Sequence, residues 1–228
     1  MSQLYLSVSA SVMLNKLSIL FRNFFPEDKN YKLLNEKFFT RIFKISYDRI
    51  EYCFKKINNK YYRNDKKIFF NHLNSDHMCT FLYFLYNSGY REKIDKKIIT
   101  KLFYLNKILH SVDIFYHVNL PDIFLLVHPL GTVIGRAKFD NYLTIYNNVG
   151  VGAEAAGRKL IYPNFGSGVI LYSGSSVIGD CKVGNNVIFG SNSKIINKNI
   201  KDNKVVLGDF AKNRIKNNKI NNIKINFY

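Results

Sequence analysis

A six-residue period in the C-terminal half constrains this fold more than any other feature of the sequence. Large apolar residues recur at every sixth position, and a small or modest residue follows four places after each of the first five. The large set is Phe165, Leu171, Val177, Val183, Phe189 and Ile195, and the small set is Val169, Ser175, Cys181, Val187 and Ser193. A period of six fits neither a helix nor a plain alternating strand. It predicts a parallel β-solenoid, in which each unit is one short strand plus a turn.

The repeat is irregular before residue 165. From Ile134 to Phe139 the step is five residues, so one coil is expected to be short by one. From Val151 to Phe165 the interval is fourteen, two more than two units. The segment Gly152–Pro163 is therefore expected to be a loop extruded from the solenoid.

The chain before the repeat has helical spacing. Apolar residues recur at helical intervals in residues 31–45, 47–62 and 97–110, and residues 79–86 are nearly all apolar. The sequence Asn87-Ser88-Gly89 is expected to stop a helix. We predict an α+β chain with a helical domain over 1–112, a repeat domain over 113–212 and a basic tail over 213–228, which is either a solvated end or an extra strand.

Composition narrows the cellular setting and the partners. Three scattered cysteines argue against a disulfide framework, and no apolar run is long enough for a membrane span. A cytoplasmic protein is expected, with contact to a membrane surface left open. The net charge is +18, but Lys, Asn, Ile, Tyr and Phe are enriched together along the chain and no nucleic-acid motif is present. We therefore expect no nucleic-acid partner.

Three stretches resemble the hexapeptide-repeat acyltransferases, and among them the serine acetyltransferases. They are VHPLGTVIG (127–135), YPNFGSGVILYSGSSVIGDCKVGNNVIFGSNSKI (162–195) and VVLGDFAK (205–212), the last with Phe210 where a proline is usual. The resemblance implies a left-handed parallel β-helix and a homotrimer, with pairing of trimers into hexamers as a further option. It also implies that acetyl-CoA is the co-substrate and lies between neighbouring solenoids.

The resemblance places a general base at His128. Transfer of an acetyl group from a thioester to a hydroxyl needs a base, and histidine titrates near neutrality. Asp113 lies fifteen positions earlier, close to one coil's length, and in the resembled family an aspartate at that spacing holds the imidazole. Two other interpretations stay open: His128 as a buried, satisfied histidine, and Asp113 as a helix cap or turn residue.

The resemblance also suggests ligand-binding residues. Small residues at Ser173, Gly174 and Ser191 let the cofactor approach the turns, and Lys212 is placed to meet its phosphates. Asp76 falls near an acidic segment that binds the acceptor amine in the family. His72 and His77 lie beside Asp76, but no third ligand has a telling spacing, so we expect a surface loop there and no metal.

The acceptor is where the sequence departs from the resembled enzymes. Their extruded loop ends in Arg-His-Pro, which holds the serine carboxylate, whereas this chain has Ile161, Tyr162 and Pro163. An aspartate that contacts the serine amine is replaced by Val127. Losing both anchors disfavours a zwitterion, and Tyr162 suits a sugar ring. Three hypotheses follow: an O-acetyltransferase for a sugar of surface polysaccharide, a serine O-acetyltransferase, and a non-catalytic scaffold.

Overall fold

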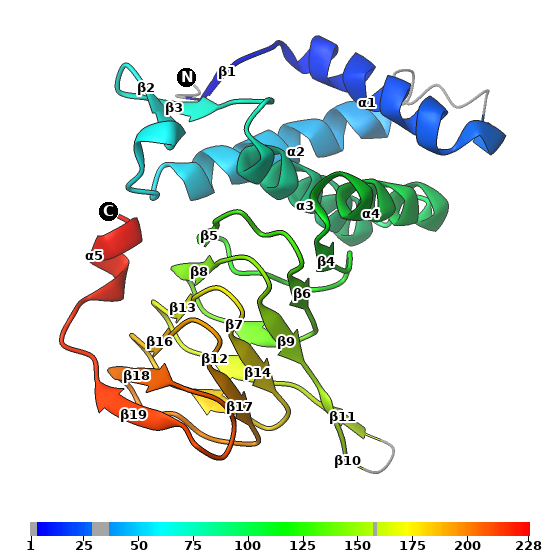
Figure 1. Cartoon of the computed structure of the whole chain (residues 1–228). Helices are drawn as coiled ribbons and strands as arrows, with labels where there is room; N and C mark the ends of the chain where they lie inside the picture. Colours follow the sequence, from blue (N-terminus) through cyan, green and yellow to red (C-terminus); the bar gives the residue numbers. More distant parts are fainter. Residues whose placement is uncertain (1–3, 29–36, 157–158) are drawn as a thin grey trace. The chain divides into compact units, whose positions relative to one another are not determined.

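The computed structural model describes residues 4–28, 37–156 and 159–228 and divides the chain into two compact units (Figure 1). One unit holds the helices up to His110. The other runs from Ser111 to Tyr228 and includes the short segment Lys56–Asn59. Because helices and parallel sheets are segregated along the chain, the coarse mixed fold that the sequence predicts is present.

The described residues of the helical unit form four α-helices, two 3₁₀ turns and a small sheet. The helices are α1 (Ala10–Phe24), α2 (Lys37–Phe54), α3 (Ser75–Arg91) and α4 (Lys96–His110), and the 3₁₀ turns are η1 (Pro26–Asp28) and η3 (Lys60–Tyr62). The sheet has the order β1 (Leu4–Leu6), β3 (Lys67–Phe70) and β2 (Arg63–Asn64). It was not expected, because residues 65–75 are polar and interrupted in sequence.

Two predicted helix boundaries in this unit are wrong. Residues 37–45 and 47–54 of the two predicted segments belong to one helix, α2, which ends before η3, while residues 31–36 lie outside the described part of the chain. The expected stop at Asn87–Gly89 lies inside α3. The Arg49 guanidinium donates to the Asn87 Oδ1 at 3.0 Å and to the Ser88 Oγ at 2.9 Å. These bonds satisfy buried polar groups that would otherwise favour a helix end.

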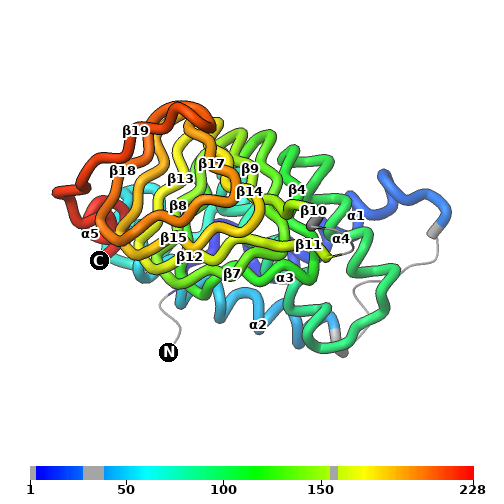
Figure 2. The backbone as a smooth tube through the Cα atoms, turned by 90° about the horizontal axis from the view of Figure 1, so that it is seen from below, coloured from blue at the N-terminus to red at the C-terminus, as the bar shows by residue number. Residues whose placement is uncertain are grey.

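The second unit is a stack of coils in which the chain visits three parallel sheets in turn (Figure 2). The six-stranded sheet contains β5 (Phe124–Leu126), β8 (Leu143–Ile145), β13 (Ile170–Leu171), β16 (Ile188–Phe189), β18 (Lys204–Leu207) and β19 (Arg214–Asn217). The five-stranded sheet contains β4 (Asp113–Ile114), β6 (Val133–Ile134), β9 (Gly150–Gly152), β14 (Ser176–Ile178) and β17 (Lys194–Ile196). The three-stranded sheet contains β7 (Lys138–Phe139), β12 (Asn164–Phe165) and β15 (Lys182–Val183).

The hexapeptide pattern sets the interior of this stack. The predicted large and small residues from Phe165 to Ile195 are all buried. Leu171 pairs with Ile145 on one side and Phe189 on the other, and Val177 pairs in the same way with Val151 and Ile195. Each apolar position therefore stacks on its equivalent in the next coil, which removes its side chain from water.

The insertion before residue 165 has a different size from the one expected. Val151 belongs to the five-stranded sheet and Phe165 to the next sheet along the chain, so their interval is one unit plus eight residues, and not two units plus two. The extra residues form the antiparallel pair β10 (Glu154–Ala156) and β11 (Lys159–Ile161), which projects from the stack in Figure 1.

The C-terminal segment is ordered as part of the second unit. β19 pairs antiparallel with β18, so the expected extra strand is present and the solvated end is not. A short helix, α5 (Asn222–Asn226), follows. The Tyr228 N–H then donates to the Lys56 carbonyl and the Asn58 N–H to the Asn226 carbonyl, both at 2.8 Å.

Candidate active site

His128 lies on the turn that joins β5 to β6. Its backbone is left-handed, with φ of 47°, and its carbonyl accepts the Leu130 N–H at 2.8 Å. The residue is exposed, so the alternative of a buried, satisfied histidine is wrong. A left-handed backbone at a non-glycine residue costs free energy and is enriched at functional sites.

Asp113 lies on the strand next to this turn. It pairs with Val133 in the β4–β6 ladder, and its N–H donates to the Thr132 carbonyl at 2.9 Å. The Gly131 N–H in turn donates to the Ser111 carbonyl at 2.9 Å. Asp113 therefore caps no helix. It occupies the coil adjacent to the His128 turn, while its role toward the imidazole stays a prediction.

Three of the four predicted cofactor residues share the edge of the stack on which His128 lies. Ser173 and Gly174 lie on the turn from β13 to β14, and Ser191 on the turn from β16 to β17. All these turns, like that of His128, lead from the six-stranded to the five-stranded sheet. The Asn192 N–H donates to the Ser173 carbonyl at 2.9 Å, which joins the two turns. The fold thus aligns residues far apart in sequence along one edge.

Gly174 and Lys212 illustrate how these turns are built. Gly174 has φ of 73°, and a Cβ there would lie 2.1 Å from the Asn192 Oδ1. Only glycine fits such a position without displacing its neighbour. Lys212 is exposed after β18, and its N–H donates to the Asp209 carbonyl at 3.1 Å.

Tyr162 follows the β10–β11 hairpin and lies against Gly135. A Cβ on Gly135 would be 3.0 Å from the Tyr162 Cε1 and 3.4 Å from its Cδ1. The residue after Gly135, Arg136, donates from its Nε to the His117 Nε2 at 2.5 Å. Burial, and then the charge of Arg136, lower the pKa of His117. The sequence analysis assigned no role to Arg136 or His117. His117 follows β4 and Arg136 follows β6, and these two strands pair.

Asp76 lies in the first turn of α3 in the helical unit, so its assignment to acceptor binding stays a prediction. The surface loop expected for its neighbour is wrong, because His77 is 0% exposed and its Nδ1 accepts the Asn71 N–H at 3.1 Å. The rings of Phe54, Tyr62 and Phe70 surround it. Among the residues that the structure describes, no three His, Cys, Asp or Glu side chains gather as metal ligands.

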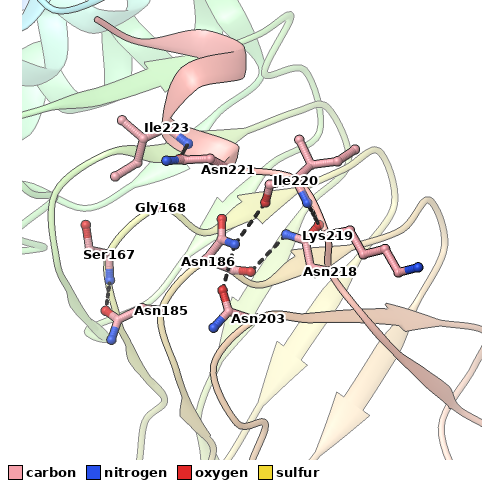
Figure 3. A pocket seen from close by; sticks show the side chains of 10 residues that line it. All are labelled: Ser167, Gly168, Asn185, Asn186, Asn203, Asn218, Lys219, Ile220, Asn221 and Ile223. Carbon is pink, nitrogen blue, oxygen red and sulfur yellow. Dashed lines mark hydrogen bonds between the residues drawn. The ribbon is translucent and has the colours of Figure 1, made fainter.

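A separate hollow of about 450 Å³ lies where the C-terminal segment covers the turns after β12 and β15 (Figure 3). Its lining is mostly asparagine. The Asn186 Nδ2 donates to the Asn203 Oδ1 and to the Ile220 carbonyl, each at 2.9 Å, and the Asn218 Nδ2 donates to the Asn186 carbonyl at 3.0 Å. Because these amides bond one another, we interpret the hollow as part of the attachment of the C-terminal segment.

No protein-family model and no curated protein matches the sequence. The similar solved structures include several serine acetyltransferases. The Neisseria gonorrhoeae enzyme in complex with serine is 18% identical, with 78% of this chain and 72% of that chain covered and a TM-score of 0.62. The Brucella abortus enzyme is 16% identical, with 91% and 77% covered and a TM-score of 0.57. A serine acetyltransferase complex with CoA is 18% identical, with 64% and 58% covered and a TM-score of 0.55.

At these identities the likeness shows the fold, and function has to be argued from the site. No helix among the described residues combines the length and apolar character needed to cross a membrane.

Proposed function

We propose that this chain is an acetyl-CoA-dependent O-acetyltransferase. The fold of serine acetyltransferases, including one solved with CoA, supports this proposal. The observation that carries it is the alignment of the His128, Ser173 and Ser191 turns on one edge of the stack. An extended thioester substrate bound along that edge would pass the histidine. The proposal includes closure of the coils into a left-handed β-helix and assembly as a trimer.

In the proposed reaction His128 removes the proton of the acceptor hydroxyl while the oxygen attacks the thioester carbonyl. The bond from carbonyl carbon to sulfur then breaks, and the leaving thiolate takes the proton from His128. Asp113, on the adjacent strand, would orient the imidazole and stabilise its charged form. A backbone N–H would bind the oxyanion of the tetrahedral intermediate.

Serine is the acceptor that the comparisons favour, since the similar structures are serine acetyltransferases and one contains serine. A sugar hydroxyl is the second candidate. It is supported by the Tyr162 ring at the position where the resembled enzymes have a charged anchor. Both candidates use the same base and the same thioester, so only a comparison of acceptors distinguishes them.

The release of CoA thiol, measured across a panel of L-serine, free sugars and sugar nucleotides, tests the proposal. His128→Ala should lower kcat by about a hundredfold or more with every active acceptor, because it removes the base. His72→Gln, in the helical unit, is the matched control and should retain activity. Unchanged turnover in His128→Ala would remove the proposed base, and no thiol release with any acceptor would favour the scaffold hypothesis.

A further inference from the structure

The C-terminal segment, residues 214–228, has an inner side that is bound to the stack of coils. The Asn222 Nδ2 donates to the Gly168 carbonyl at 2.8 Å, and the Asn226 Nδ2 donates to the Thr144 Oγ1 at 3.1 Å. These partners lie 54 and 82 positions earlier in the chain. The segment therefore runs back along one side of the stack, from β19 to α5 (Figure 1).

The outer side of this segment carries apolar side chains that face water. In α5, Ile223 lies against the stack, since a Cβ on Gly168 would be 3.1 Å from its Cγ1. Two residues further along a helix the direction of the side chain changes by about 200°. Ile225 therefore points away from the stack and is 41% exposed. Ile220 and Tyr228 are 58% and 65% exposed. Three large exposed side chains within residues 220–228 form a patch, which marks an interaction surface.

The same side of the segment is positively charged. Residues 210–228 include no Asp or Glu, and all of their basic residues are exposed. The basic residues are Lys212, Arg214, Lys216, Lys219 and Lys224. In β19, Ile215 stands opposite the buried Val206, so the next residue, Lys216, points to the outer face of the sheet. Asp202, in the coil that the segment contacts, offsets only one of these charges.

The centre of the segment is held by the amides of the hollow described above (Figure 3). The Ile220 carbonyl accepts from the Asn186 Nδ2 at 2.9 Å, and the Ile220 N–H donates to the Asn218 Oδ1 at 3.1 Å. The Lys219 side chain extends away from these amides. Because the backbone is already fixed, a partner that binds the outer side does not have to order it, which lowers the entropic cost of binding.

We propose that the outer side of the C-terminal segment binds the surface of a membrane that contains anionic lipids. The residues of this outer surface are Lys216, Lys219, Ile220, Lys224, Ile225 and Tyr228. Lysines near an anionic bilayer are attracted to its headgroups, while apolar side chains enter the boundary between headgroups and acyl chains. Lysine is a point charge on a flexible stem, which suits a diffuse layer of phosphates better than one shaped partner. This inference goes beyond acetyl transfer and does not depend on it.

Co-sedimentation with vesicles tests the charged part of the surface. The full chain should bind phosphatidylcholine vesicles that contain about 30% phosphatidylglycerol at least tenfold more tightly than vesicles of phosphatidylcholine alone. Replacing three lysines of the outer surface by Gln should weaken binding to the anionic vesicles by about tenfold or more. This variant carries Lys216→Gln, Lys219→Gln and Lys224→Gln. Its control removes three exposed lysines of the helical unit, through Lys66→Gln, Lys67→Gln and Lys96→Gln, and should change binding by less than about twofold.

The apolar part is tested by Ile220→Ser combined with Ile225→Ser, which should weaken binding to the anionic vesicles several-fold. Leu73→Ser combined with Leu160→Ser, at two exposed apolar positions elsewhere, is the control and should leave binding unchanged. Thermal unfolding of each variant verifies that the stack is intact.

Three results would overturn the proposal. One is equal binding to neutral and anionic vesicles, and another is an equal loss in the two lysine variants, which would show that only net charge matters. The third is binding to polyglutamate that is as tight as to the anionic vesicles and equally sensitive to the lysine changes, which would assign the surface to an acidic protein partner. Vesicle binding by a protein that releases no CoA thiol would support the membrane surface while the proposed acetyl transfer fails.

Discussion

The Tyr162 ring packs against Gly135 so closely that a methyl group added to this glycine would lie 3.0 Å from the Tyr162 Cε1. This contact joins the end of the β10–β11 hairpin to the strand end that carries Arg136. The hairpin therefore ends beside the turn that begins at Gly135, although the sequence separates the two by a complete coil and the insertion.

Gly135→Ala tests this contact. The new Cβ would lie 3.0 Å from both the Tyr162 Cε1 and the Val151 carbonyl oxygen, so the ring has to move. We expect a loss of about 1–2 kcal/mol in the free energy of unfolding, the usual cost of overpacking. Gly152→Ala is the control, since nothing lies within 4 Å of a Cβ there, and it should be close to neutral. Thermal unfolding of both variants compares them, and equal stability would show that Tyr162 does not require Gly135.

Gly174→Ala should destabilise the stack through two separable effects. The left-handed backbone at φ of 73° costs about 1–2 kcal/mol for alanine, and the Cβ clashes with the Asn192 Oδ1. Gly208→Ala, at φ of 80° with its nearest contact at 3.5 Å, has the backbone cost alone. We expect Gly174→Ala to be the worse by about 1 kcal/mol or more in denaturant unfolding. Adding Asn192→Gly to Gly174→Ala should remove this extra destabilisation. If stability does not recover, the Asn192 side chain does not pack against Gly174.

Protonation of His77 should weaken the helical unit in acid. Burial lowers the pKa of its ring from 6.5 to about 4. Below pH 6.5 the unfolded chain binds the proton and the folded chain does not. The contribution of the neutral His77 to the free energy of unfolding is therefore fully present above pH 6.5. It falls as the pH drops below 6.5 and is lost as the pH passes through 4, a total of about 3 kcal/mol. His110, whose pKa is also lowered to about 4 by burial, adds to the effect.

His77→Phe provides the measurement. The difference in unfolding free energy between pH 7 and pH 4.5 should shrink by about half in this variant, with His110 contributing the rest. Comparing each protein with itself at the two pH values removes the constant cost of the lost Asn71 hydrogen bond. A pH dependence identical to that of the wild type would show that His77 does not titrate in this range.

Asn222 should fix the C-terminal segment. It is buried, its Nδ2 donates to the Gly168 carbonyl at 2.8 Å, and its Oδ1 accepts from the Asn218 Nδ2 at 2.9 Å. Asn222→Ala removes the partner of the Gly168 carbonyl and of the Asn218 Nδ2. Each buried polar group left unsatisfied lowers the free energy of unfolding by about 1–3 kcal/mol. Amide exchange at Phe227 and Tyr228 should accelerate. Asn217→Ala, an exposed position on β19, should leave exchange unchanged, and slow exchange in both variants would contradict this role.

The six-residue pattern correctly predicted which residues of the repeat face inward. The inward series from Phe165 to Ile195 is buried because a six-residue unit brings the same face inward at every step. The helices show where this reasoning stops. Asn87–Gly89 has the composition of a helix end, but Arg49 from α2 satisfies the buried polar groups and α3 continues. A hydrogen-bond partner 38 positions away cannot be inferred from the local pattern of residues.

The sequence by itself determined the period, the inward residues and the presence of an insertion, because these follow from steric and hydrophobic demands repeated every few residues. The tertiary structure decided the size of the insertion, since only strand pairing shows which sheet Phe165 joins. It also decided which polar groups meet. Arg136 and His117 face each other because β4 and β6 pair in register, and hydrogen bonds across that pairing depend on distances that the order of residues does not contain.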